Sequence, residues 1–224
     1  MRLPRGAAGV PTTSWSAGGS RWRARPPTLV VLVAGLWIFG SGESALIEAG
    51  IGNSPWTVFA QGLGAHVGIS IGAATFVTSV VILAAWPLLG VRFGLGTLAN
   101  AVVIAVAIDV MTEVLPQPHR IALQLGQALA GIGAIGLGSG LYLTANLGPG
   151  PRDGLMTGLH HRLVLPVARV RLGIELSVVL VGWLLGGTVG AGTVLFAALV
   201  GYAVSLGLAL VTPRRHNPLL ASRP

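Results

Sequence analysis

Charged side chains are scarce in this sequence, so the few that stand inside apolar stretches are its candidates for chemistry. Charged residues make up 9% of the 224 residues. Arg152 and Asp153 follow the helix-breaking sequence Gly-Pro-Gly-Pro, and a helix that begins there offers unpaired N–H groups that favour anions. The pair is a candidate gate or ligand contact. In the alternative interpretation, Asp153 complements the helix N-terminus and Arg152 meets lipid headgroups.

Four further charged residues stand where burial makes a charge costly. Arg171 and Glu175 lie one helical turn apart and can pair on one helix face, either as a coupling or substrate site or as a structural ion pair. Glu43 and Asp109 are carboxylates deep in apolar segments, which makes them candidate proton or cation sites. Carboxylates that face a water-filled vestibule would explain these two positions equally well.

Polar and aromatic residues beside two glycine- and proline-rich stretches complete the candidate set. The stretches are residues 50–63 and 146–159. Non-helical backbone is tolerated within a membrane where it is buried in protein or lines a cavity, so we expect both stretches to line a path for a small molecule or an ion. The path candidates are Glu43, Asn53, Trp56, Asp109, Asn146, Arg152, Asp153, Arg171 and Glu175.

The sequence offers no catalytic or cofactor-binding pattern, so we expect neither an enzyme nor a bound cofactor or metal. It contains no cysteine and no HExxH. Residues 131–136 match the dinucleotide fingerprint in letters, but they lie inside an apolar segment with no strand before it. Gly136 and Gly140 instead have the small-xxx-small spacing that is typical of helix packing in membranes.

The elements that must position these residues are membrane helices. Hydrophobic residues make up 53% of the chain and fall in long blocks without charge, each long enough for a helix that crosses a bilayer. In lipid, each such segment must pair its own backbone groups, which a helix does. We expect an all-α membrane protein with six transmembrane helices, roughly at residues 28–50, 69–89, 96–115, 121–146, 167–185 and 193–212.

Arginine positions set the expected orientation. If the N-terminus is inside, thirteen of the fourteen arginines fall on the inner side, and only Arg120 falls on the outer side. By the positive-inside rule, this distribution places both termini in the cytoplasm, and we expect the protein in an inner membrane. The formal net charge of +8 then indicates contact with anionic lipid and not with nucleic acid.

The sequence repeats itself at an offset of 96 residues. The residues that coincide are mostly helix breakers, among them Gly52 with Gly148 and Pro55 with Pro151. We infer two homologous halves of three spans each, which enter the membrane from opposite sides as an inverted repeat. Each proline should begin a short broken or re-entrant helix. The expected division is a disordered basic tail at 1–27, halves at 28–116 and 124–212 with a linker at 117–123, and a C-terminal tail at 213–224.

Three segments of the second half carry a family resemblance. They are Gly-Pro-x-Pro-Arg-Asp-Gly-Leu-Met from Gly148, Arg171-x-x-x-Glu175, and the turn Gly-Gly-x-x-Gly-x-Gly-Thr from Gly186. They resemble the YczE/YyaS/YitT group of bacterial integral membrane proteins, the YczE branch most closely, and the resemblance covers roughly residues 30–212. In the first half, Thr57 stands where an acidic residue is expected in that group. The resemblance implies a membrane protein with a transport-related role.

These observations together predict a small secondary transporter or permease. Its substrate would bind near the midplane between the two broken stretches, and one half would rock against the other to give alternating access. The expected partners are the lipid bilayer, an unidentified small molecule or ion, and a second copy of the chain if a homodimer is the working unit. The alternative is a non-transporting accessory protein that supports a membrane-associated assembly or the export of its product.

Overall fold

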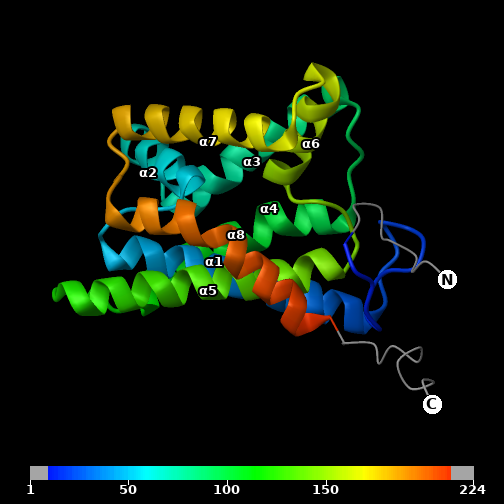
Figure 1. Cartoon of the computed structure of the whole chain (residues 1–224), viewed down its shortest axis with the longest axis horizontal. Coiled ribbons are helices and arrows are strands. Elements are labelled where there is room, and N and C mark those ends of the chain that lie inside the picture. The colour runs from blue at the N-terminus through cyan, green and yellow to red at the C-terminus, as the bar shows by residue number, and fades with distance from the viewer. Residues whose placement is uncertain (1–9, 213–224) are drawn as a thin grey trace, which may run out of the picture.

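The computed structural model describes residues 10–212, which form eight helices and no strand. Figure 1 shows the helices lying side by side, nearly all along one direction. Their bounds are α1 Pro26–Ala49, α2 Pro55–Val67, α3 Ile71–Leu89, α4 Leu95–Val114, α5 Ile121–Thr144, α6 Pro151–Leu163, α7 Val167–Leu184 and α8 Ala191–Val211.

The helices coincide with the segments expected from the sequence. Five of them are long and apolar enough to cross a membrane, namely α1, α3, α4, α5 and α8. The sixth expected span is not confirmed, because α7, an 18-residue helix that carries Arg169, Arg171 and Glu175, is not among these five. The short helices α2 and α6 each begin with the expected proline, Pro55 and Pro151, whose missing N–H costs nothing in a first helical turn.

The helices pack as two layers, each with helices from both halves of the sequence. In the lower layer, α1 packs on α4 and α5, and α5 packs on α8. In the upper layer, α2 packs on α3 and α7, and α6 also packs on α3 and α7. Figure 1 shows α7, α2, α3 and α6 above α4, α8, α1 and α5. Between the layers, α4 packs on α3 and makes a small contact with α6.

Glycines bring the helices of the lower layer into close contact. A Cβ atom on Gly136 or Gly140 would collide with the backbone of α8, at Ala203 and Gly207 respectively. A Cβ atom on Gly138 would lie 2.6 Å from the backbone nitrogen of Phe39 in α1. The helix-packing role expected for Gly136 and Gly140 is therefore confirmed, and the contact depends on the absence of side chains.

Replacing Gly207 by alanine is expected to destabilise the protein by about 1–3 kcal/mol, because the added methyl group would overpack the contact with the Gly136 backbone. The matched control is Gly201→Ala on the same helix, where a Cβ atom meets nothing within 4 Å. Thermal unfolding of both purified variants in dodecyl maltoside compares them. Equal loss of stability in the two variants would mean that α5 and α8 do not pack through Gly207.

The two glycine- and proline-rich breaker stretches, residues 50–63 and 146–159, each form a hydrogen bond with the other half of the chain. The N–H of Gly192, at the start of α8, donates to the carbonyl of Ile51 at 2.8 Å. At the start of α4, Gly96 N–H donates to the carbonyl of Leu147 at 2.9 Å. The two residues of the second bond are the 96-residue equivalents of the two residues of the first. The donor lies in the second half of the chain in the first bond and in the first half in the second bond. Each breaker is thus fixed by the half to which it does not belong.

Residues 10–25 differ from the expected disordered tail. The N–H of Ala17 donates to the carbonyl of Ala145 at 3.0 Å, and the hydroxyl of Thr28 donates to the carbonyl of Trp15 at 2.7 Å. Leu95 N–H, at the start of α4, donates to the carbonyl of Arg21. These bonds hold the segment against the ends of α4 and α5. The expected tail at 213–224 and residues 1–9 lie outside the described residues.

Candidate functional site

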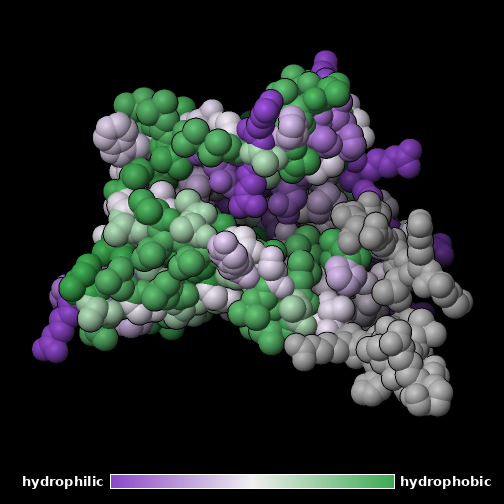
Figure 2. Space-filling model, in the orientation of Figure 1, coloured by the Kyte–Doolittle hydropathy of each residue, from purple (hydrophilic) through white to green (hydrophobic). Residues whose placement is uncertain are grey.

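A cavity of about 360 Å³ lies between the two layers, and all eight helices contribute to its walls. Its polar side consists mainly of residues from α1, α2, α3 and α6, together with an ion pair on α7. Its apolar side comes from Phe39, Ile104, Ile135, Phe196, Val200 and Val204. Figure 2 shows hydrophilic residues gathered between the upper and lower layers, with apolar residues on both sides of them. The volume is at the lower end of the range for small-molecule sites, about 300–1,000 Å³.

Two short helices begin at this cavity. Ser54, the N-cap of α2, lies against Glu43, almost two turns before the end of α1, so the chain turns back between the layers before α2 starts. Gly150, the N-cap of α6, also lines the cavity. Neither cap gives its helix a side-chain hydrogen bond. The first N–H groups of both helices therefore lack intrahelical acceptors and bring partial positive charge to the cavity.

Glu43 is the most deeply buried charged residue of the site, with 1% of its surface exposed. Its Oε2 accepts hydrogen bonds from the hydroxyls of Ser54 at 2.7 Å and Thr57 at 2.8 Å. Thr57 thus stands beside an acid, where the family resemblance led us to expect an acid in its own position. The other carboxylate oxygen, Oε1, has no hydrogen-bond partner among the described residues.

Arg152 faces Glu43 across the layer interface. Its Nη1 lies 3.9 Å from Glu43 Oε1, which is an ion pair without a hydrogen bond. Its guanidinium stacks over the ring of Trp56, 5.3 Å from the centroid. The charge of Glu43 and the stacking on Trp56 hold the guanidinium in place. Because the arginine side chain is 21% exposed, its N–H donors remain open toward the cavity.

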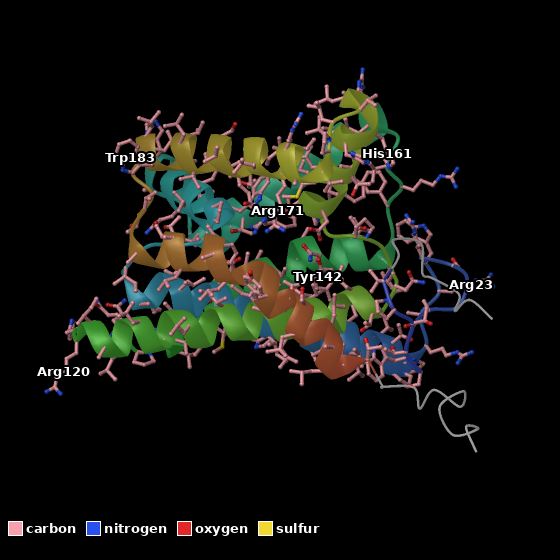
Figure 3. The ribbon with its side chains drawn as sticks, viewed as in Figure 1. Arg23, Arg120, Tyr142, His161, Arg171 and Trp183 are labelled. Carbon is pink, nitrogen blue, oxygen red and sulfur yellow. The ribbon has the colours of Figure 1, made fainter. Side chains whose placement is uncertain are left out.

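Two further polar pairs complete the walls. The phenol of Tyr142 donates to Asp153 Oδ2 at 2.6 Å, and Arg171 Nε donates to Glu175 Oε1 at 2.8 Å. Figure 3 shows Arg171 on α7 and Tyr142 on α5 on opposite sides of the space between the layers. A second hollow between α7 and α8 shares four lining residues with the cavity, namely Arg171, Glu175, Val200 and Gly201. The cavity and this hollow are therefore neighbours at the seam between α7 and α8.

Three of the nine sequence candidates lie outside the cavity. Asn53 Nδ2 donates to Gln61 Oε1, which also accepts the N–H of Thr188, so Asn53 ties α2 to the loop before α8. Asp109 accepts from the hydroxyl of Ser70 at 2.7 Å and from the N–H of Gly72 at 2.8 Å. Asn146 Nδ2 donates to the carbonyl of Ala17 at 3.1 Å. These three residues join elements around the cavity and do not line it.

The six other candidates all line the cavity: Glu43, Trp56, Arg152, Asp153, Arg171 and Glu175. The sequence analysis missed Ser54, Thr57 and Tyr142. The signal for Ser54 and Thr57 was their place in the first turn of a helix that follows a breaker, three residues apart. Tyr142, one of only two tyrosines, is 5% exposed near the end of a membrane helix, where its hydroxyl needs a partner. Among the described residues, no group of three or more histidines and carboxylates is placed to hold a metal ion.

The comparisons with known proteins address the chain as a whole. A family described as "Family of unknown function (DUF6198)" matches residues 27–207, which include all the cavity-lining residues. The chain belongs to the DUF6198 family. This DUF6198 protein is 41% identical over 209 residues to an uncharacterised protein of Haemophilus influenzae, with 93% of this chain and 95% of that one covered.

A second relative of the DUF6198 protein confirms the resemblance seen in the sequence. It is the "Uncharacterized membrane protein YczE" of Bacillus subtilis, 34% identical over 183 residues, with 78% of this chain and 82% of the relative covered. No solved structure matches the chain significantly. The family, the relative and the five long apolar helices together establish a YczE-like membrane protein.

Proposed function

We propose that this protein is a small secondary transporter of the inner membrane that works by alternating access, with both termini in the cytoplasm. The observation that carries the proposal is the cavity between the layers, at which two uncapped helix N-termini, one from each half, begin. Broken helices whose N-termini meet at a central site are typical of secondary transporters built from inverted repeats. The surrounding helices keep the polar groups of the cavity away from lipid, where these groups would lack hydrogen-bond partners.

The pattern of helix contacts supports two repeated halves. Contact between α1 and α4 is matched by contact between α5 and α8, and that between α2 and α7 by that between α6 and α3. The bond from Gly192 to Ile51 is matched by the bond from Gly96 to Leu147. With an odd number of spans in each half, these correspondences favour an inverted arrangement in the membrane.

The contact between α3 and α4 has no extensive counterpart between α7 and α8, and this difference suggests how the cavity opens. The seam between α3 and α4 is closed, because Gly72 packs against Ala105 and Asp109. The equivalent seam between α7 and α8 holds a hollow that shares lining residues with the cavity, and a Cβ atom added at Gly201, the equivalent of Ala105, would meet nothing within 4 Å. In our proposal the transporter alternates between a state open at α7 and α8 and a state open at α3 and α4. In that alternation, the hydrogen bonds that Asp109 accepts from Ser70 and Gly72 hold the seam between α3 and α4 closed.

The moving bodies in this proposal are the two layers, and not the two sequence halves as the repeat had suggested. Movement of one half against the other would separate α1 from α5 and α2 from α7, which are extensive contacts. Movement of one layer against the other leaves those contacts intact and changes those of α4 with α3 and α6. Proteins rearrange most readily where few contacts must be exchanged.

Single cysteines test the orientation, since the chain has none of its own. Ala65→Cys lies at the exposed end of α2, and His161→Cys is its equivalent in α6. In intact cells, a membrane-impermeant maleimide is expected to label position 65 at once and position 161 only after lysis. Labelling of both positions from the same side would overturn the inverted arrangement.

A third cysteine tests the alternation itself. Ser79 lies in the cavity wall with 5% of its surface exposed, and cysteine is nearly isosteric with serine. In oriented proteoliposomes, Ser79→Cys is expected to react with a small impermeant thiol reagent applied from either side, while Ala65→Cys and His161→Cys each react from one side. Access to Ser79→Cys from one side alone would favour a static accessory protein.

A further inference from the structure

The unpartnered groups in the cavity specify a ligand with both an acceptor and a donor. Among the described residues, three buried side-chain atoms that belong to cavity-lining residues lack a hydrogen-bond partner: Glu43 Oε1, Trp56 Nε1 and Thr75 Oγ1. Their residues are 1%, 7% and 3% exposed. Trp56 Nε1 can only donate and Glu43 Oε1 as a carboxylate can only accept, so no single simple ion would satisfy both.

The ion pair across the cavity is held apart. Arg152 Nη1 and Glu43 Oε1 are 3.9 Å from each other, beyond hydrogen-bonding distance, yet each still has unused hydrogen-bonding capacity. Stacking on Trp56 holds the guanidinium, and the hydroxyls of Ser54 and Thr57 hold the carboxylate. A ligand with opposite charges at a short separation can bind both groups, with its anion on the planar arginine fork and its cation on Glu43.

The total charge of the cavity favours a ligand that is neutral overall. The charged groups in its walls are three carboxylates, of Glu43, Asp153 and Glu175, and two guanidiniums, of Arg152 and Arg171. The two helix N-termini add about half a positive charge each, which offsets the excess carboxylate. A net anion or a net cation would bring an unbalanced charge into an apolar surrounding, where it is costly.

We propose that the cavity binds a zwitterion with an apolar body: an ammonium group at Glu43 Oε1, an anionic group at Arg152, Trp56 Nε1 and the N-terminus of α6, and the body against Phe39 and Phe196. This inference rests on the proposed function for its purpose, since it names the class of substrate that the transporter would carry. The same head chemistry occurs in a free apolar amino acid and in an ethanolamine phospholipid headgroup, which could reach the cavity through the seam between α7 and α8.

Equilibrium binding to the purified full chain in dodecyl maltoside tests the proposal in two arms. The first arm compares L-leucine with 4-methylpentanoate, which lacks the ammonium group, and with 3-methylbutylamine, which lacks the carboxylate. The second arm compares dihexanoyl phosphatidylethanolamine with dihexanoyl phosphatidylglycerol, which lacks the ammonium group. We expect the zwitterion of at least one arm to bind at least about 10-fold more tightly than its single-charge analogues. The arm that shows this preference identifies the source of the ligand.

Two variants assign the ends of the ligand. Glu43→Gln is expected to remove the preference for the zwitterion over the analogue without an ammonium group, and Arg152→Gln the preference over the analogue without a carboxylate. The matched controls are Glu113→Gln and Arg120→Gln, at exposed positions outside the cavity, which should leave both preferences intact.

Binding of no zwitterion in either arm, or analogues that bind as tightly as the zwitterions, would overturn the inference. Because the measurement is binding to the solubilised protein, its outcome is separable from that of the labelling experiments. Two-sided labelling of Ser79→Cys without zwitterion binding would leave a transporter of another substrate. Zwitterion binding with one-sided labelling would leave a binding protein that does not transport.

Discussion

Replacing Arg152 by methionine is expected to lower the stability of the protein by about 3 kcal/mol or more, which is one of the two largest effects that the structure predicts. Methionine keeps an unbranched apolar stem, but it removes the guanidinium, and with it both the positive charge opposite Glu43 and the stacking on Trp56. Glu43 is 1% exposed, so its charge would remain buried without compensation. The midpoint of thermal unfolding should fall by about 6–12 °C in detergent.

The reverse change should be much milder. In Glu43→Gln, the side-chain carbonyl can still accept the hydroxyls of Ser54 and Thr57, and Arg152 remains 21% exposed to solvent. The double variant Glu43→Gln, Arg152→Met should therefore be more stable than Arg152→Met alone, with a coupling free energy of about 1–3 kcal/mol. If the two single effects simply add in the double variant, Glu43 and Arg152 do not act as a pair.

Replacing Gly52 by alanine is expected to destabilise the protein by about 3–6 kcal/mol, for two reasons that act together. Gly52 has φ +114°, a conformation that side-chain-bearing residues rarely adopt. A Cβ atom there would also lie 2.5 Å from the backbone nitrogen of Gly190 and 2.8 Å from Thr193 Oγ1. The added methyl group would thus push the breaker stretch away from the start of α8. The measurement is the yield of monodisperse protein together with its unfolding midpoint.

A control glycine separates the two reasons. Gly68, the C-cap of α2, has φ +78°, but a Cβ atom there meets nothing within 4 Å. Gly68→Ala should cost only the backbone term, about 1 kcal/mol. A Gly52→Ala variant that is no less stable than Gly68→Ala would mean that the breaker stretch does not dock on α8. Gly148→Ala, at φ +116° and 2.7 Å from Thr97 Oγ1, should behave like Gly52→Ala.

Much of the secondary structure could be predicted from the sequence. The long apolar blocks predicted the long helices, and Pro55 and Pro151 predicted where α2 and α6 begin. The layers could not be predicted, because helices that are apolar on all sides give no periodic signal of which face meets which neighbour. The division into layers depends instead on backbone contacts at glycines, and a glycine alone does not name its partner helix.

The charges of the candidate site and the local pair of Arg171 with Glu175 were predictable, but the pairs between different helices were not. Glu43 and Arg152 stood out because a charge within a membrane needs a reason. Their contact joins residues 109 positions apart, and it exists only because two breaker stretches bring two helix starts to one cavity. Asp109 stood out by the same rule but closes a seam between α3 and α4, because its partners Ser70 and Gly72 are contributed by another helix.

The docking of each breaker stretch on the opposite half has a consequence for biosynthesis. The carbonyl of Ile51 receives its hydrogen bond from Gly192, at the start of α8, the last helix among the described residues and one of the last parts of the chain to leave the ribosome. The glycines of α1 that contact α5 likewise have no partner until α5 has been made, and α2 cannot pack on α7 until α7 has been made. Contacts between such distant parts of a chain form late in folding. The first half therefore enters the bilayer with this stretch unpaired, and the cavity closes around Glu43 only once α8 is present.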